Sequence, residues 1–354
     1  MLLRFTALVL LVGAPAALCA QERPGTPQAQ EMTMLEAAYR NGGIGTAVAT
    51  YELLARRGPD HVLLNQLARW AVTAPSTSSD EVVRHGACIA TLPYTRDKAC
   101  LATLQAAMGD NNAPFAIRLM AVNALRRAKD PFAEKALATI AREAAAQNPI
   151  AAAPLLREVD PSVSVPLLRA MLASADPQAQ FAAAAVLSRT PGAAARAALA
   201  ERVDELRGSA RIAAVAGLAA SGGAQQREET AAALPLLGGF DLFLAAEALQ
   251  RAGDSRGTKA LTGLLGGDDE SLALEAADAL KDGVEKTRAR AAIRAALASK
   301  NPIIRAQALK IWVEAGWPSD VETRKRLADA DPTVRIEAAS VVFRETSATP
   351  PRQP

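Results

Sequence analysis

The chain has 354 residues, 50% hydrophobic and only 4% aromatic, and its 40 basic and 37 acidic residues give a net charge of +3. This near-balance excludes the strongly basic footprint of a nucleic-acid-binding protein. Alanine, leucine and arginine dominate, and β-branched residues seldom alternate with polar ones as they do in strands. Because the length exceeds the usual size of one globular core, we predict an all-α protein made of several domains or of a repeat array.

Residues 1–20 have the pattern of a cleaved secretory signal peptide. Arg4 precedes the apolar run "FTALVLLVGAPAALCA", which is short and is interrupted by a glycine and a proline, whereas a membrane-spanning helix needs about 20 apolar residues. Cleavage after Ala20 would place the mature chain in the periplasm or outside the cell. A lipoprotein is the alternative, but it would require a small residue before Cys19, where the sequence has Leu18.

Two predicted segments precede the main part of the chain. Residues 21–30 are expected to be flexible, and residues 31–79 to form a helical cap followed by a joint at "APSTSS". The stretch "EMTMLEAAYRNGGIGTAVATYELLARRGPDH" resembles one tetratricopeptide-type helical hairpin, with its turn at the glycines. The residues that carry this resemblance are Gly42, Ala47, Tyr51, Leu54 and Pro59. We expect the hairpin to pack on the following repeats as an N-terminal cap.

Beyond the joint, a local pattern recurs with a period of about 31 residues. Its centre is an alanine, usually followed four residues later by an apolar residue. Asp or Asn often lies seven residues before the alanine, sometimes with Pro next, and this combination favours the start of a helix. The central alanines are Ala90, Ala121, Ala152, Ala183, Ala214, Ala245, Ala276, Ala308 and Ala338.

Each unit holds two short helices and cannot bury its apolar face alone, so neighbouring units must stack. We therefore predict an α-solenoid, a right-handed superhelix of antiparallel helix pairs, over residues 80–346. The segments "DPTVRIEAASVV", "NPIIRAQALKIW" and "DPQAQFAAAAVL" resemble HEAT repeats, in particular the short HEAT-like class first associated with phycobilisome lyases. Residues 347–354 are rich in proline and are expected to be disordered.

The resemblance to HEAT repeats implies a ladder of Asp and Arg side chains between successive repeats. Asp331 and Arg335 would belong to it in the last unit. The alternatives are a local pair along one helix, or a binding role for the arginines. The residues assigned to this ladder are Asp176, Asp269, Asp331, Arg118, Arg211, Arg305 and Arg335.

Two cysteines, Cys88 and Cys100, remain after signal cleavage. If the chain turns at residues 93–97, each cysteine lies about one helical turn from that point on facing helices, which permits the Cα separation of a disulfide. Exported proteins usually keep such pairs oxidised, so we predict a structural disulfide. A zinc site that uses His85 with both cysteines is the alternative, but it lacks a fourth ligand because His61 lies in another segment. We predict no metal and no cofactor.

The sequence contains no motif typical of catalysis: there is no G-x-S-x-G elbow, P-loop or H-E-x-x-H. Deoxyhypusine hydroxylase, which resembles the chain in architecture, holds iron with His-Glu dipeptides, but here Val62 follows His61 and Gly86 follows His85. Phycobilin lyases act on a pigment inside the cell, which fits an exported chain with few aromatic residues poorly. We expect a protein that is not an enzyme. A small-ligand carrier or enzyme that uses the concave groove is the alternative.

We predict a scaffold or adaptor of the cell envelope that binds a protein partner on the concave surface of the array. Two basic clusters, residues 288–294 and 322–329, are either solvated helix faces or sites of salt-sensitive contact with an acidic partner or anionic lipids. We expect no nucleic-acid partner and no integral membrane segment in the mature chain. Large side chains that would supply affinity if exposed, and otherwise belong to the core, are Trp312, Trp317, Phe240 and Phe243.

Overall fold

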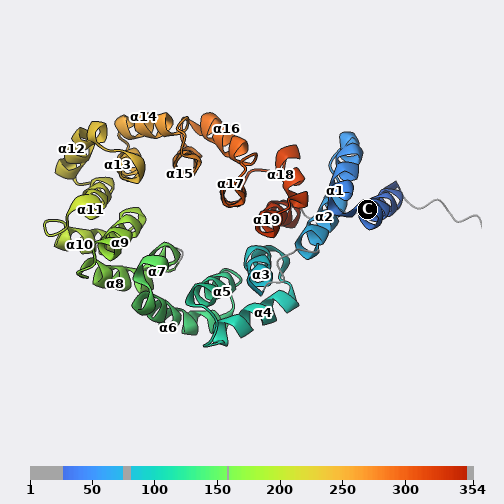
Figure 1. The fold of residues 1–354 in the computed structure, drawn as a ribbon, viewed down its shortest axis with the longest axis horizontal. Coiled ribbons are helices and arrows are strands. Elements are labelled where there is room, and N and C mark those ends of the chain that lie inside the picture. The colour runs from blue at the N-terminus through green and yellow to red at the C-terminus, as the bar shows by residue number, and fades with distance from the viewer. Residues whose placement is uncertain (1–26, 75–80, 158, 349–354) are drawn as a thin grey trace, which may run out of the picture.

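A computed structural model describes residues 27–74, 81–157 and 159–348, and in it the α-helices are stacked into a closed ring (Figure 1). These residues contain no β-strand, which confirms the predicted all-α solenoid. Helices alternate along the chain between an inner and an outer layer of the ring (Figure 1). The predicted signal peptide, residues 21–26, most of the predicted joint and residues 349–354 lie outside the described residues.

The two layers divide the helices of the array by their order in the chain. The inner helices are α3 (Glu81–Thr95), α5 (Phe115–Arg127), α7 (Pro149–Leu156), α9 (Pro177–Arg189), α11 (Gly208–Ala220), α13 (Gly239–Arg251), α15 (Glu270–Leu280), α17 (Pro302–Glu314) and α19 (Pro332–Ala348). The outer helices are α4 (Lys98–Gly109), α6 (Pro131–Gln147), α8 (Pro161–Leu172), α10 (Ala193–Arg202), α12 (Ala224–Ala233), α14 (Ser255–Leu264), α16 (Lys286–Ala296) and α18 (Val321–Lys325). Short 3-10 turns, η2 (Leu234–Leu236) and η3 (Arg326–Ala328), follow α12 and α18.

Capping residues fix where several inner helices begin. The side chain of Asp176 accepts a hydrogen bond from the backbone N–H of Gln178 at 2.9 Å, and that of Asn301 accepts one from Ile303 at 3.0 Å. A proline occupies the first turn of both helices, where its missing N–H costs nothing. The Asp/Asn-Pro pattern thus acts as a set of helix starts, as the sequence indicates.

The repeated alanines lie where the inner helices pack on their neighbours. Ala90 is half-buried, and the other eight central alanines are at most 3% exposed. Small side chains allow the helices to approach closely, and this is most evident in α11, which is mainly alanine and glycine. A Cβ added at Gly217 would lie 2.7 Å from the Cα of Ser188 and 2.6 Å from Cδ1 of Leu199.

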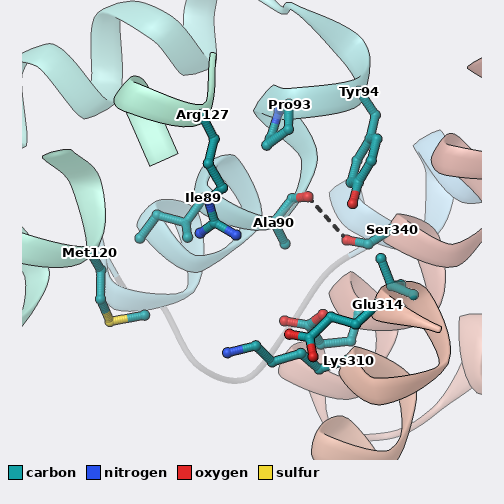
Figure 2. Close-up of a pocket in the computed structure, with 11 residues that line it drawn as sticks. Ile89, Ala90, Pro93, Tyr94, Met120, Arg127, Lys310, Glu314 and Ser340 are labelled. Carbon is teal, nitrogen blue, oxygen red and sulfur yellow. Dashed lines mark hydrogen bonds between the residues drawn. The ribbon is translucent and has the colours of Figure 1, made fainter. Parts of the chain in front are cut away.

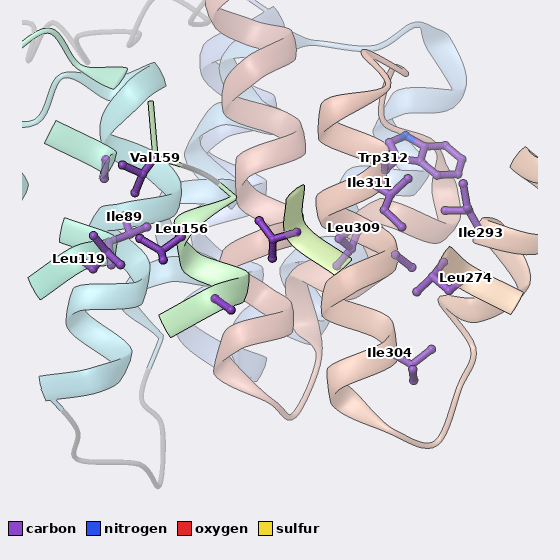
Figure 3. Packing of buried hydrophobic residues seen from close by; sticks show 14 of the residues in the cluster. Ile89, Leu119, Leu156, Val159, Leu274, Ile293, Ile304, Leu309, Ile311 and Trp312 are labelled. Carbon is purple, nitrogen blue, oxygen red and sulfur yellow. The ribbon is translucent and has the colours of Figure 1, made fainter. Parts of the chain in front are cut away.

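The ring closes because α19 packs beside α3 in the way that one inner helix packs on the next. It contacts α17 from its own end of the array, and α2 and α3 from the other end (Figure 1). Residues on all sides of α19 are buried as a result, including Val334, Ala338, Val341 and Val342, each at most 1% exposed. A single apolar cluster therefore runs through the junction, with members in both ends of the array (Figure 3).

Side-chain hydrogen bonds to backbone carbonyls link the C-terminal helix α19 to α2 and α3. Ser340 Oγ donates to the carbonyl of Ala90, and Ser347 Oγ to that of Tyr94, each at 3.2 Å. Arg335 donates from Nε to the carbonyl of Ala71 at 3.3 Å. Each bond joins residues about 250 positions apart in sequence, so they belong to the closure and not to the repeat.

The N-terminal helices adjoin this junction and pack on the end of the array opposite to the expected one. They are α1 (Pro27–Leu54) and α2 (His61–Thr73), joined by the turn η1 (Ala55–Arg57). α2 packs on α19 and η3, and α1 contacts α18 and η3. Arg324 makes two hydrogen bonds to Glu52, at 2.6 and 3.0 Å. The hairpin was expected on the N-terminal repeats, but closure brings the C-terminal repeats to the same place.

The glycines at 42–45 lie between two helical segments of α1, at the position of the predicted turn: Gly43 is non-helical, with φ 69° and ψ −167°, a conformation that glycine adopts without strain. Two boundaries differ from the sequence prediction. Helix α1 begins at Pro27, within the segment expected to be flexible, and Gln28 donates to Asp60 at 3.0 Å. At the other end α19 continues to Ala348, into the predicted tail.

Replacing Gly217 by alanine should destabilise the protein, because the new Cβ would force α9 and α10 away from α11. Overpacking of this kind costs about 1–3 kcal/mol, which urea unfolding would measure. Gly263→Ala in α14 is the matched control: its Cβ meets open space, and glycine-to-alanine in a helix is stabilising by up to about 1 kcal/mol. Equal stability of the two variants would contradict the close packing around α11.

Arg324→Ala should loosen the junction. It removes two charged hydrogen bonds to Glu52, whose side chain is 22% exposed against 13% for Arg324, and such bonds contribute about 1.5–3 kcal/mol. We expect a loss of roughly 2 kcal/mol in the free energy of unfolding. Arg169→Ala is the control because it breaks a pair with Glu201 in which both side chains are exposed, which should have a much smaller effect. Equal losses in the two variants would show that the Arg324 pair contributes nothing to closure.

Candidate binding site at the ring junction

A pocket of about 140 Å³ lies where the two ends of the array meet. Four inner helices form it: α3 and α5 from the start of the array, and α17 and α19 from its end (Figure 2). Ile89, Pro93, Met120 and Val313 give it apolar walls. Pro93 also interrupts the hydrogen bonding of α3, since proline has no N–H for the carbonyl four residues earlier.

Charged side chains of both signs surround the apolar walls. Arg127 comes from the end of α5, Lys310 and Glu314 from α17, and Glu337 from α19. In Figure 2 Arg127 lies on one wall, and Lys310 and Glu314 lie on the opposite one. Apolar and polar side chains therefore share the lining of the pocket in comparable measure.

Tyr94 supplies the aromatic ring of the pocket. Its side chain extends from α3 toward α19 (Figure 2). Burial raises the pKa of the Tyr94 hydroxyl above its ordinary value, although Arg127 and Arg344 act in the opposite direction. The phenol consequently stays protonated at neutral pH and can donate a hydrogen bond.

A second hollow, of about 330 Å³, lies between α6, α7, α8 and α9. Alanines form much of its lining, together with Leu167 and Met171, and Arg142 is its one charged residue. It has fewer polar side chains than the junction pocket. Ligand-binding sites usually combine an apolar lining with a few precisely positioned polar groups. We therefore take the junction pocket as the candidate site.

A buried ionic network follows the inner layer away from the junction. Arg189 of α9 reaches past α11 and lies 3.0 Å from Glu247 of α13 and 3.5 Å from Glu275 of α15. Gln307 of α17 donates to Glu275 at 2.9 Å. Its members thus come from four of the inner helices. The small residues of α11 leave room for Arg189 to cross, so this network fixes how tightly the ring bends there.

Cys88 and Cys100 form a disulfide that joins α3 to α4, with Cα atoms 5.0 Å apart. The bond lies in the first repeat of the array, directly beside the junction. His85, the third member of the alternative zinc set, is buried in α3. Within residues 27–74, 81–157 and 159–348, no group of three or more His, Cys, Asp or Glu side chains could hold a metal ion.

The three aspartates of the expected ladder act as helix caps instead. Asp176 accepts from the backbone at the start of α9, Asp269 at the start of α15 and Asp331 at the start of α19. Asp331 accepts a hydrogen bond from the N–H of Thr333 at 2.8 Å, whereas Arg335 donates to backbone carbonyls. This corrects the predicted pairing: these three carboxylates accept from the free N–H groups that begin their own helices.

The arginines of the expected ladder bond other groups. Arg305 forms the contact that most resembles a ladder step, with two hydrogen bonds to Asp329 of the next unit at 2.7 and 2.9 Å. The carboxylate it uses lies two residues before the predicted one. The remaining contacts are Arg118 with Glu143 at 2.9 Å, Arg211 with Glu229 at 2.8 Å, and Arg335 with the carbonyls of Asp329, Ala330, Ala71 and Ala74.

The large side chains considered for binding divide between core and surface. Trp312 and Phe243 are fully buried, Trp317 is half-buried, and Phe240 is 41% exposed. The two tryptophans pack edge to face, with ring centroids 5.1 Å apart. Two of these four residues therefore belong to the core, and Phe240 is the most accessible.

The basic clusters make contacts within the protein. In the first, the guanidinium of Arg290 lies 5.0 Å from the ring centroid of Trp312, and Arg294 pairs with Asp320 at 2.7 Å. In the second, Arg324 joins Glu52 across the junction. Some members of each cluster therefore make contacts within the protein, while Arg288, Arg294 and Lys325 are exposed as on a solvated face.

Sequence analysis missed the junction pocket, since its walls come from both ends of the chain. One signal was available. The terminal unit of an open array is expected to have a polar outer face, yet Val334, Ile336, Val341, Val342 and Phe343 place apolar residues on every side of α19. Apolar residues on every side of α19 indicate that helices other than α17 also pack against it.

Comparison with known proteins gives only distant similarities. No model of a protein family matches the chain, and no curated protein matches it. Human deoxyhypusine hydroxylase is similar at 16% identity and a TM-score of 0.37, over 69% of this chain and 96% of the other. The CpcE–CpcF complex of phycocyanin lyase from Nostoc sp. PCC7120 is similar at 20% identity and a TM-score of 0.31, over 73% and 91%. An engineered protein is similar at 20% identity and a TM-score of 0.16, over 80% and 97%. Scores this low assign neither a family nor an activity.

No helix in the described part of the chain has the length and apolar character needed to cross a membrane.

Asp329→Asn should destabilise the protein at neutral pH but not in acid. Burial acts to raise the pKa of Asp329, but hydrogen bonds from Arg305 and the backbone outweigh it and lower the pKa below its ordinary value. A carboxyl with a lowered folded pKa stabilises above its unfolded pKa of about 3.9, and this contribution is lost as pH falls through the folded value.

Unfolding should therefore show the variant less stable than the parent by roughly 1–3 kcal/mol at pH 7, with a difference that shrinks below about pH 4. Asp282→Asn, at an exposed position, is the control and should change little at either pH. A difference independent of pH would show that packing, and not the Asp329 charge, causes the loss.

Proposed function

We propose that this protein is an exported, non-catalytic scaffold that binds a protein partner on the inner side of a closed ring of HEAT-like repeats. The observation that carries the proposal is the packing of α19 between α17, α2 and α3, which joins the two ends of the array. Closure fixes the spacing of the inner helices before any partner arrives. A surface ordered in advance loses less conformational entropy on binding, which favours affinity.

The size of the candidate pocket supports a protein partner over a small-molecule substrate. Sites for drug-sized ligands usually measure about 300–1,000 Å³, whereas the junction pocket measures about 140 Å³. A volume of this kind suits one side chain of a larger molecule. The second hollow, at about 330 Å³, is where the alternative function of a small-ligand carrier would be tested.

Two features support export from the cytoplasm. The first 20 residues have the charge and apolar pattern of a signal peptide. The disulfide between Cys88 and Cys100 suits an oxidising compartment such as the periplasm or the exterior. Together they favour a partner in the cell envelope.

Affinity purification of residues 21–354 from an envelope extract of the source organism would test the proposal. A ring-opened variant, Arg324→Ala with Arg335→Ala, removes bonds that join the C-terminal repeats to the N-terminal helices α1 and α2. Arg169→Ala with Arg288→Ala removes the same charge from exposed pairs and is the matched control. We expect one protein to co-purify in fixed stoichiometry with the parent and with the control. Its recovery with the ring-opened variant should fall at least fivefold, which corresponds to a coupling free energy of about 1 kcal/mol or more between closure and binding.

If no protein co-purifies in fixed stoichiometry, or if only a metal, pigment or other small molecule does, the scaffold proposal is wrong. Equal recovery by the ring-opened variant would mean that the partner binds a local surface and that closure is not needed.

A further inference from the structure

We propose that the second hollow, between α6, α7, α8 and α9, binds a small anionic amphiphile, namely a carboxylate with one acyl chain of about eight to ten carbon atoms. This goes beyond the proposed function, because it concerns a small ligand and needs no protein partner. Three features carry it: the unequal lengths of two outer helices, the apolar lining of the hollow, and an arginine whose charge no other described residue neutralises.

The hollow lies where α6 is longer than the outer helix that follows it. Both helices begin alike, with an aspartate as N-cap and a proline in the first turn, but α6 has 17 residues and α8 has 12. The last part of α6, about 7.5 Å long at the usual rise per residue, therefore has no counterpart in α8 to pack against. Ala145 and Ala146 lie in this part of α6. Pro149 and Ala179, in the first turns of α7 and α9, border the hollow on the inner side.

The lining is mainly apolar, and the volume is that of a small-molecule site. Leu167 and Met171 of α8 contribute the larger apolar side chains, and four alanines form much of the remaining wall. Sites for drug-sized ligands usually measure at least about 300 Å³, and this hollow measures about 330 Å³. This is roughly twice the apolar cavity of about 150 Å³ that binds benzene, so a ligand of about ten to twelve carbon and oxygen atoms fits.

Arg142 identifies the ligand as an anion. It is the one charged residue of the lining and is exposed on α6. Its guanidinium has no hydrogen bond, ion pair or ring contact with any residue that the structure describes, because the adjacent Glu143 pairs with Arg118 at 2.9 Å. Ser174 also lines the hollow, and its hydroxyl oxygen accepts from the N–H of Asp176 at 3.1 Å, which leaves the hydroxyl hydrogen able to donate. A carboxylate head group and an apolar chain match these two donors and the apolar wall.

The test uses the methyl group of Met171 as a reporter, in residues 21–354 that carry ¹³C at the methionine methyl carbons. Octanoate is the probe, hexanoate is the shorter acid, and octan-1-ol is the neutral compound with the same chain. We expect octanoate to shift the Met171 resonance in a saturable way. Hexanoate should bind about 5- to 15-fold more weakly, since each buried methylene contributes about 0.8 kcal/mol. Met120 in the junction pocket and Met34, which is 54% exposed on α1, are internal controls and should not respond.

Variants of Arg142 test the charge of the ligand. Arg142→Ala should weaken octanoate binding about three- to fivefold, as for an exposed ion pair, and should leave the binding of octan-1-ol unchanged. Arg142→Lys keeps the positive charge and should restore most of the affinity for octanoate. Arg196→Ala on α10 is the matched control, because Arg196 is also exposed and lies outside the lining. It should bind octanoate as the parent does.

A second pair of variants tests the volume. Ala170 is an exposed part of the lining on α8, so Ala170→Leu should partly fill the hollow without harming the helix, in which leucine is well tolerated. Octanoate binding at Met171 should fall at least about tenfold, since several methylenes lose their place. Ala197→Leu makes the same change at an exposed position of α10 outside the lining and should leave octanoate binding unchanged.

The inference is overturned if Met171 does not respond to octanoate, or if Met120 and Met34 respond with the same affinity, as in general apolar adsorption. It is also overturned if Ala170→Leu leaves octanoate binding unchanged. An anionic ligand is ruled out if Arg142→Ala does not weaken octanoate, or weakens octanoate and octan-1-ol equally. Because these measurements use purified protein and small probes, their outcome is independent of whether a protein partner binds the ring.

Discussion

Burial of α19 between α17, α2 and α3 is the interaction on which the rest of this structure depends. In an open solenoid the terminal repeats have one neighbour each and need polar caps. Here α19 gives α3 the neighbour that it would otherwise lack, and α2 covers the outer side of α19. The placement of the N-terminal helices, the Glu52–Arg324 pair and the junction pocket all depend on this arrangement.

Closing a ring requires each repeat to bend the stack by the right amount, and the small residues of the inner helices provide this. In α11 alanine and glycine let α9 and α13 approach closely enough for Arg189 to reach Glu247 and Glu275. A buried ion pair adds little net stability once desolvation is included. Its geometry is restrictive, however, so we interpret the network as a device that selects one curvature over others.

The sequence predicted the features that depend on nearby residues. Helix starts at Asp176 and Asn301, and the buried central alanines, follow from capping and packing within one repeat. Closure depends on contacts such as Ser340 with Ala90, 250 residues apart, which no local pattern specifies. The ladder was misassigned for a related reason: Asp331 could cap its helix or pair with an arginine, and only the three-dimensional placement of Asp329 beside Arg305 decides between them.

Hydrogen–deuterium exchange of a chain that ends at Asp331, compared with the full chain, tests closure most directly, because it removes α19 alone. If α19 joins the ends of the array, amides of α2 and α3 should lose protection although they lie more than 230 residues away, while α9 to α13 keep theirs. Unchanged protection in α2 and α3 would contradict the closed ring and indicate an open solenoid.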